Sequence, residues 1–537
     1  MGYILDRRVK SFILTIKAYY DQLEHLSDQI EMELKNEYRR KSVAFRVFII
    51  IMMGVFRVNM NQMITLLNCT KNTMLKKFIA LFSKEDSISE QEISNTWETF
   101  KKYKDDIINL TWKIKEQYHK EYARLADSSY IKYIKDFKRR IEYNNVDKLE
   151  CIDFTKYYPN QIIPIGLKYP DDLMLKAVIY GRMSWYNGTY SLARAVSELW
   201  ELENDTTDTV IARGLGFYVY VPGKDKFYNY MKDLSEEFVE NIMMDFTEIL
   251  VKNGVIDLQQ IIIDSTTAMK RSDDMDEKAK NHKRGSPDQC YKFQFIADAS
   301  QTPLIIVRRN GEEYDTTGFK KIKDRMLKLK KIANKYNKKI DFFLADAGYF
   351  DKSNLKFISE SLGAKYIIDI NPRRSKNLSK IKKYLNNCKK LISIIYSRKS
   401  IKSSDRRKAE ITLDSKIKEL ESFLKRIKDK GNELEQLIAK EILSVGIENY
   451  LIIYRRRSVI ESLFGSLKEY YKIAGNYNNK LRLKSGEKIG VFALLICIGL
   501  QIHSITKYRL LKDNIRPIRS LYAVRLSELI LNYEKEE

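Results

Sequence analysis

Three acidic residues stand where this sequence leaves room for chemistry. Asp264 ends the apolar run IIID, Asp346 ends FFLAD, and Glu461 lies inside the basic and aromatic stretch YRRRSVIESLFGSLKEYY. Small or polar residues follow both aspartates, STT after the first and AG after the second. Carboxylates are the ligands that hard divalent cations prefer. Three of them would complete a site for two cations, one activating a nucleophilic oxygen and one stabilising the leaving oxygen of a phosphodiester.

Each acid also has an ordinary interpretation. Strands often end in aspartate because this residue forms turns and caps helices. Glu461 follows Arg457 by four residues, so the pair can be a helical salt bridge worth about 0.2–0.5 kcal/mol. Other aspartates lack the combination of a long preceding apolar run and small following residues, and we assign them to loops, strand ends and turns: Asp273, Asp274, Asp276, Asp298, Asp315, Asp341 and Asp351.

The elements that must position these acids form an α/β pattern after residue 254. Short β-rich runs occur at 256–264, 291–298, 302–309, 341–346 and 364–370, with helical patterns at 318–337 and 352–363. The first three runs follow one another with little helical signal, which predicts an antiparallel meander before helical crossovers begin. Both aspartates are expected at the carboxyl ends of central strands, where open α/β sheets place their sites.

The stretch 454–471 is predicted to be one helix. At 100° per residue, Tyr454, Arg457, Glu461 and Lys468 fall within a narrow arc, and apolar residues occupy the other side. This places a single acid in a stripe of basic and aromatic residues.

Residues 373–446 predict a helical insertion after the last β-rich run. Residues 373–408 contain 14 Lys or Arg and one acid, Asp405, which favours a phosphate-binding surface over a merely basic one. Apolar residues at 3-4-3 spacing follow from Ile417 to Ile427, and the pair at 431–432 is expected to turn the chain.

The first half of the chain is largely helical in pattern. Residues 59–82 have the spacing of a helix-turn-helix, with Thr70 as the cap of the second helix, although an ordinary helical hairpin explains the pattern equally well. Residues 189–210 repeat this pattern with a longer, acidic turn, and there simple packing is favoured.

The composition indicates a multidomain protein with a polyanionic partner. The 537 residues carry 96 Lys and Arg against 71 Asp and Glu, a formal net charge of +25. Five scattered cysteines and four histidines disfavour disulfide frameworks and zinc sites, and the N-terminus has no signal-peptide layout, so a cytoplasmic protein is expected. The apolar runs 47–56 and 489–500 are too short to span a membrane and are interpreted as core helices.

The chain resembles a DDE transposase of prokaryotic insertion sequences, in the group with the motif Tyr-x2-Arg-x3-Glu-x6-Lys. Tyr454, Arg457, Glu461 and Lys468 keep all three spacings of that motif. Asp264 and Asp346 match the first two acids, the latter in ADAGYFD. The resemblance covers about residues 255–505.

The resemblance implies a ribonuclease-H-like core, a mixed sheet with helices on both faces, interrupted by the helical insertion. It implies that Asp264, Asp346 and Glu461 hold two Mg2+ ions, with Mn2+ as a substitute. The enzyme would cut double-stranded DNA at transposon terminal inverted repeats and join the freed 3′-hydroxyl to target DNA, acting as a dimer in a synaptic complex associated with the nucleoid and away from membranes.

The basic residues around Glu461 have implied roles as well. Arg457 and Lys468 would clamp phosphates, Arg455 and Arg456 would add to the basic surface, and Tyr454 would bond a phosphate or pack. Some relatives carry a β-rich insertion with a base-stacking Trp, whereas this insertion is helical and lacks Trp; its possible stacking residues are Tyr384, Tyr396 and Phe423.

Six regions are expected along the chain: a helical N-terminal region (1–150), a helical lead-in (151–252), the two parts of the core (253–372 and 447–508), the basic insertion (373–446) and a C-terminal helical tail (509–537). Two alternative functions remain open, a noncatalytic DNA-binding protein derived from a transposase and a ribonuclease-H-like nuclease without strand transfer.

Overall fold

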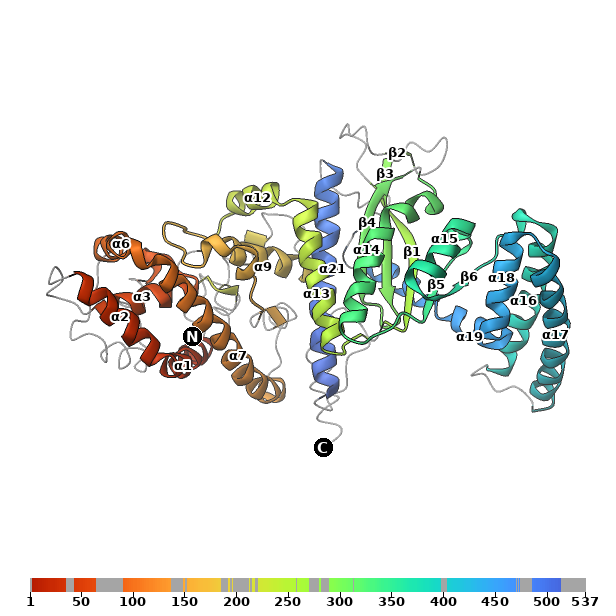
Figure 1. Ribbon diagram of the computed structural model, residues 1–537, viewed down its shortest axis with the longest axis horizontal. Helices are drawn as coiled ribbons and strands as arrows, with labels where there is room; N and C mark the ends of the chain where they lie inside the picture. Colours follow the sequence, from red (N-terminus) through yellow and green to blue (C-terminus); the bar gives the residue numbers. More distant parts are fainter. Residues whose placement is uncertain are drawn as a thin grey trace. The chain divides into compact units, whose positions relative to one another are not determined.

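The computed structural model forms two compact units (Figure 1). One unit contains residues 1–234 and 506–537, and the other contains residues 235–505. The residues that the structure describes are 2–34, 43–63, 90–136, 148–149, 152–184, 192–193, 196, 212, 215–217, 221–256, 258–269, 280–281, 289–311, 313–396, 403–469, 471, 473 and 485–512.

The N-terminal unit is helical in its described parts. Its helices are α1 (Gly2–Ala18), α2 (Tyr20–Leu34), α3 (Val43–Phe56), α6 (Glu90–Thr99), α7 (Lys104–Asp136), α9 (Asp171–Met183) and α12 (Lys224–Asp233), with short 3-10 turns at Lys101–Tyr103, Thr155–Tyr157 and Pro159–Gln161. Helix α3 is buried along almost its whole length, as expected for the apolar run 47–56 in a core. Most of the predicted helix-turn-helix (59–82) and of the segment 189–210 lies outside the described residues.

The second unit contains a mixed sheet. Its strands are β1 (Gln260–Met269), β2 (Lys280–Asn281), β3 (Gln289–Asp298), β4 (Pro303–Asn310), β5 (Phe342–Ala345) and β6 (Lys365–Ile368). The order is β2-β3-β1-β5-β6, and β4 pairs with β3. Strands β1, β3 and β4 pair antiparallel, as the meander prediction required, whereas β5 and β6 are parallel additions that follow helical crossovers.

Helices cover both faces of this sheet. Helix α14 (Asp315–Lys335) packs Phe319 against Phe343 of β5, with ring centroids 5.9 Å apart. Helix α20 (Ser458–Glu469) packs Phe464 against Phe295 of β3 at 5.4 Å. Phe295 pairs with Asp264 in the β1–β3 register, so Asp264 points to the α20 face of the sheet.

The crossover from β5 to β6 is helical but irregular. A 3-10 turn (Ala347–Tyr349) and α15 (Lys352–Lys356) lead into a π-helix (Phe357–Leu362), which ends at Gly363 with φ of +73°. Glycine suits this left-handed position because it carries no Cβ.

Two long helices lie beside one another, α13 (Glu236–Lys252), which belongs to the second unit, and α21 (Gly486–Lys512), which belongs to it as far as Ile505 (Figure 1). The Gln501 amide of α21 donates to the Thr247 hydroxyl of α13 at 2.8 Å and to the Pro303 carbonyl at 2.9 Å. By length and composition Gly486–Thr506 could cross a membrane, but 78% of its most apolar window is buried, and core helices pass the same test.

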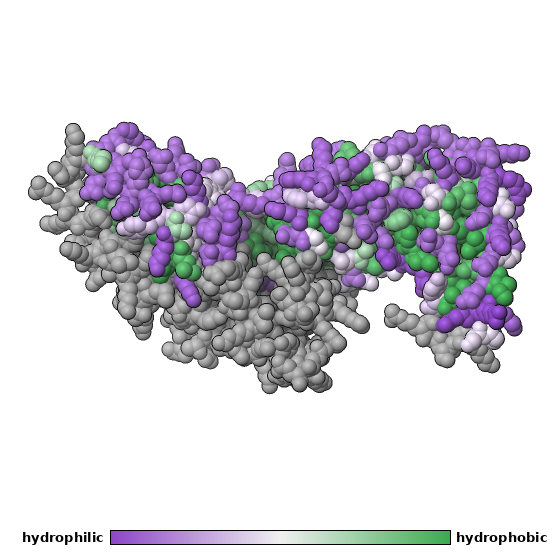
Figure 2. Space-filling view, turned by 60° about the horizontal axis from the view of Figure 1, so that its bottom comes forward, coloured by the Kyte–Doolittle hydropathy of each residue, from purple (hydrophilic) through white to green (hydrophobic). Residues whose placement is uncertain are grey.

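The segment predicted as an insertion forms three helices after a short 3-10 turn at Pro372–Arg374: α16 (Lys376–Ile395), α17 (Ser403–Lys430) and α18 (Glu433–Val445). Their apolar sides pack together, and Figure 2 shows hydrophilic side chains alternating with hydrophobic ones over this helical part. Asn432 starts α18 with a capping box to Glu435, so the chain turns between α17 and α18 where the sequence predicted.

The stretch 454–471 is not one helix, contrary to the prediction. Helix α19 (Ile447–Arg455) ends before α20 begins, and the joint at Arg456 and Arg457 is a turn. The amides of these two arginines bond the carbonyls three residues earlier, which tightens the chain and stops α19. The apolar spacing continues across the joint, so it gave no signal of the break.

Candidate active site at the carboxyl edge of the sheet

Strand pairing brings Asp264 and Asp346 to the same edge of the sheet. Strands β1 and β5 are parallel, and their last paired residues are Ile262 and Leu344. Each aspartate lies two residues beyond its member of that pair, so the two carboxylates extend from neighbouring strands. The two charges interact, because the negative charge of Asp346 helps to raise the pKa of Asp264.

The sequence predicted that Asp264 ends its strand, and this prediction is wrong. Strand β1 continues to Met269, because its antiparallel partner β3 pairs with it as far as Cys290. The parallel partner β5 stops at Ala345. Asp264 therefore sits where β1 loses one neighbour, and this opening leaves space beside its carboxylate.

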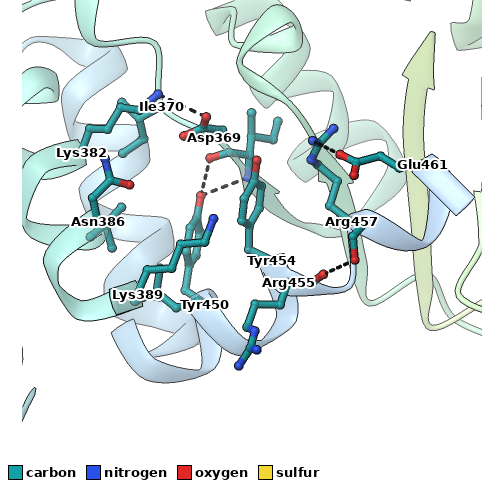
Figure 3. Close-up of a pocket in the computed structure, with 14 residues that line it drawn as sticks. Asp369, Ile370, Lys382, Asn386, Lys389, Tyr450, Tyr454, Arg455, Arg457 and Glu461 are labelled. Carbon is teal, nitrogen blue, oxygen red and sulfur yellow. Dashed lines mark hydrogen bonds and ion pairs between the residues drawn. The ribbon is translucent and has the colours of Figure 1, made fainter. Parts of the chain in front are cut away.

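Arg457 joins Asp264 to the third acid. Its Nη1 lies 3.0 Å from Asp264 Oδ2, and its Nη2 lies 2.6 Å from Glu461 Oε1. The i,i+4 salt bridge expected as the ordinary interpretation is thus present, but the same guanidinium also reaches a strand 193 residues away. Figure 3 shows Arg457 turned toward Glu461 from the joint between α19 and α20.

The two aspartates have raised pKa values. Burial is the largest cause for Asp264, and the charges of Asp346 and Asp315 add to it, raising its pKa to about 6. Burial also raises the pKa of Asp346, with Asp315 the leading charge that adds to the rise. Arg457 opposes both shifts without cancelling them. A site whose carboxylates carry more charge than its basic side chains balance attracts a divalent cation.

Asp315 and Asp369 are two acids near the site that sequence reasoning did not select. Asp315 was assigned to a turn, yet its Oδ1 accepts a 2.8 Å hydrogen bond from Ser265 Oγ, next to Asp264. Asp369 follows β6 and pairs with Lys382 of α16 at 3.2 Å. The run KYII before Asp369 was the available signal, since it is a third strand followed by an acid.

A hollow of about 460 Å³ adjoins this edge on the α16 and α19 side (Figure 3). Tyr450 and Tyr454 line it from α19, and Lys382, Asn386 and Lys389 line it from α16. The Lys389 ammonium lies 5.6 Å from the centre of the Tyr454 ring. Burial raises the pKa of Tyr454, so this phenol stays protonated and can donate a hydrogen bond.

The remaining predicted residues are more exposed. Arg455 lines the hollow, and Arg456 donates to the Gln260 amide oxygen at 3.1 Å. Lys468 lies in the last turn of α20 with an exposed side chain. Of the residues proposed to stack on a base, Tyr384 and Phe423 pack on each other at 6.1 Å, whereas Tyr396 is exposed.

The donor set suits a hard divalent cation, although the acids are not drawn together around one point. In the described part of the chain, no three His, Cys, Asp or Glu side chains are placed to share a metal ion. Asp264 and Asp346 lie on neighbouring strands, while Glu461 is 56% exposed and forms a salt bridge with Arg457. The oxygen ligands and the raised carboxylate pKa values fit a cation, and Arg457 supplies positive charge to the same acids.

The carboxylates of Asp264 and Asp346 lie together at the carboxyl edge of an open α/β sheet, where such sheets place their ligand sites. Residues 257–498, a little under half of the chain, match the family model described as the transposase DDE domain. No curated protein and no solved structure matches the chain. The matched residues include Asp264, Asp346 and Glu461, and the match supports a DDE transposase.

Proposed function

We propose that this chain is a DNA transposase of the insertion-sequence type whose catalytic acids are Asp264, Asp346 and Glu461. The observation that carries the proposal is the β1–β5 register, which sets Asp264 beside Asp346 on neighbouring parallel strands. Arg457 then ties Glu461 to Asp264. The match of this region to the transposase DDE domain supports the same reaction class, and we interpret the domain as a ribonuclease-H-like core carrying a helical insertion.

The three acids would hold two Mg2+ ions, or Mn2+ in their place, which supply Lewis acidity to the attacking and leaving oxygens of a phosphodiester. With a pKa of about 6, Asp264 is mostly ionised at neutral pH and can act as a ligand. Arg457 holds Asp264 and Glu461 until substrate arrives, and its remaining donors can bind a phosphate.

The hollow beside Glu461 suits a DNA strand. Lys389 and Arg455 provide positive charge, and Tyr454 provides an aromatic face with a hydroxyl donor. Together with Arg456, Lys468 and the basic part of α16, these groups would hold the phosphates on either side of the scissile bond. The DNA would be double-stranded, comprising the terminal inverted repeats and the target, and the protein would act in the cytoplasm as a dimer that pairs two ends.

The test is cleavage and joining of a DNA duplex that carries the element's terminal inverted repeat. Asp264→Asn, Asp346→Asn and Glu461→Gln should each lower Mg2+-dependent cleavage at least about a thousandfold, since several kcal/mol of transition-state stabilisation is lost. Asp351→Asn is the matched control, because Asp351 lies five residues after Asp346 but only caps α15 through Ser353. Cleavage that persists in the three variants would refute the assignment, and cleavage without joining would indicate a nuclease.

A further inference from the structure

The carboxylate of Asp315 is held in place by the side chains around it. It begins α14, and its Oδ1 accepts from Arg309 Nη2 at 2.6 Å. The Arg309 side chain has no exposed surface, and its Nη1 donates to the Tyr314 carbonyl at 2.9 Å. A Cβ at Gly318 would lie 2.0 Å from Arg309 Nη1, so this buried arginine fits only against a glycine.

The fixed carboxylate is linked to both aspartates of the sheet edge. Ser265 donates its hydroxyl to Asp315 Oδ1 at 2.8 Å and its amide to Asp264 Oδ1 at 2.8 Å. A Cβ placed on Gly348 would be 3.0 Å from Asp346 Oδ1 and 3.2 Å from Asp315 Oδ2. Oxygens of Asp346 and Asp315 therefore border one small space beside an exposed glycine.

Buried polar groups on the same side of the sheet point toward a polar ligand. Gln294 pairs with Ser265 in the β1–β3 register and shares its face. The Gln294 amide and the Tyr349 hydroxyl are fully buried and interact with each other, and the part of the chain that the structure describes gives neither group another hydrogen-bond partner. The negative charges of Asp315 and Asp264 act on the Tyr349 hydroxyl, so this group faces the acids. A buried pair that lacks its full set of hydrogen bonds favours a water molecule or an ion nearby.

We infer that Asp315 is a positioning residue of the proposed cation site and a second contact for the hydrated cation. Its Oδ1 fixes Ser265 and thereby the carboxylate of Asp264, and its Oδ2 accepts hydrogen bonds from water on a divalent cation held by Asp264 and Asp346. Asp315 thus acts on the face of the sheet opposite to Glu461. The inference rests on the proposed function, because it requires a cation at the aspartate pair.

A purely structural role makes a different demand on Asp315. A brace between α14 and β4 needs an acceptor for Ser265 and a negative charge for the buried Arg309 guanidinium, so its loss lowers the unfolding temperature in EDTA. A cation contact needs the same negative charge, but its loss weakens Mn2+ binding by the folded protein. Asp315→Asn keeps the shape of the side chain, so the unfolding temperature reports the brace and Mn2+ binding by the folded variant reports the cation contact.

The experiment is isothermal titration calorimetry of Mn2+ into the full chain without DNA, with the unfolding temperature in EDTA as a check on folding. Asp315→Asn should weaken Mn2+ binding about 10-fold to 100-fold, the usual cost of losing an outer-shell partner. Gly348→Ala, at an exposed turn, should also weaken binding because its methyl group enters the space between the two carboxylates. Asp351→Asn and Gly465→Ala, whose new methyl group meets nothing within 4 Å, are the matched controls and should bind as the parent does.

The outcomes separate the inference from the function on which it rests. If the parent binds Mn2+, Asp264→Asn does not, and both Asp315→Asn and Gly348→Ala bind like the parent, Asp315 has no role at the cation and the inference fails alone. If Asp264→Asn and the parent bind Mn2+ equally, the aspartate pair holds no cation and both ideas fall. Should Asp315→Asn unfold, Gly348→Ala decides the matter, because parent-like binding by that variant contradicts a shared space.

Discussion

Each of the two units contains an acid that contacts an arginine, the buried Asp172 in one and the half-buried Asp264 in the other, and the two pairs differ in charge balance. In the N-terminal unit, Asp172 receives Arg57 Nε at 2.9 Å and Arg57 Nη2 at 2.6 Å, and also the Thr155 hydroxyl at 3.1 Å. In the second unit, Asp264 has one 3.0 Å contact with Arg457, which it shares with Glu461. Burial raises the pKa of both acids, but the bidentate Arg57 outweighs it at Asp172, so that pKa is lowered.

The difference separates an ion pair that holds a fold together from a group prepared for a ligand. Asp172 and Arg57 balance each other's charge, and the Nη1 of Arg57 donates to the carbonyls of Gln161 and Ile162. The charges of Asp346 and Asp315 act on Asp264, and among the described residues Arg457, which Asp264 shares with Glu461, is the arginine that contacts it. Desolvated groups whose charge is not matched are typical of functional sites. Burial alone would have ranked Asp172, with 4% of its side chain exposed, as the more perturbed acid, above Asp264 with 16%.

Removing the acid should affect the two units very differently. Asp172→Ala leaves Arg57 buried without its partner and should cost about 3–5 kcal/mol of stability. Asp264→Ala removes one of several repelling carboxylates and should cost little or even stabilise the second unit in EDTA. Differential scanning calorimetry of the full-length variants measures both effects. Equal losses of stability in Asp172→Ala and Asp264→Ala would show that the difference in charge balance between the two sites does not affect stability.

The pH dependence of stability should also differ, and the sign follows from the direction of each pKa shift. The folded pKa of Asp264, about 6, exceeds the reference value of 3.8, so ionised Asp264 destabilises the folded state by on the order of 3 kcal/mol above pH 6. That penalty is lost as the pH falls from 6 toward 4. Asp172 has a lowered pKa, so its stabilising effect persists over this range and is lost only at lower pH.

Denaturant unfolding of the full chain in EDTA at several pH values measures this dependence. Asp264→Asn should show a smaller gain in stability between pH 6 and pH 4 than the parent, because Asp346, whose pKa is also raised, still contributes, while Asp351→Asn should retain the full gain. Identical curves for the parent and Asp264→Asn would contradict the raised pKa.

Replacing each arginine by lysine should give the smallest effects. Arg57→Lys keeps the charge but cannot reproduce the bidentate contact and the two carbonyl bonds, and should cost roughly 1–2 kcal/mol of stability. Arg457→Lys should leave stability within about 0.5 kcal/mol, since the site already lacks a balanced pair. It should lower DNA cleavage about tenfold, because one ammonium cannot hold Asp264 and Glu461 together as a guanidinium does. A stability loss at Arg457→Lys as large as at Arg57→Lys would make Arg457 a structural residue.

Local patterns predicted much of the fold because the strands and helices are regular. The predicted β-rich runs all contain strands, and their order along the chain distinguished the antiparallel part from the parallel part. The break at Arg456 and Arg457 escaped prediction because apolar spacing continues through it. Asp315 was set aside because no long apolar run precedes it, whereas its place beside Ser265 depends on the packing of α14 against β4.

The sequence by itself determined which residues carry carboxylates and cations, where strands and helices form, and the motif spacing on which the resemblance to a transposase rests. These properties depend on neighbouring residues in the chain. Only the tertiary structure decided that Asp264 lies inside β1, that Arg457 links it to Glu461, and that Asp315 joins the group. Strand register and helix packing fix those contacts between residues far apart in the chain. A local sequence pattern does not show which distant charged residues will lie together at the partly buried edge of the sheet.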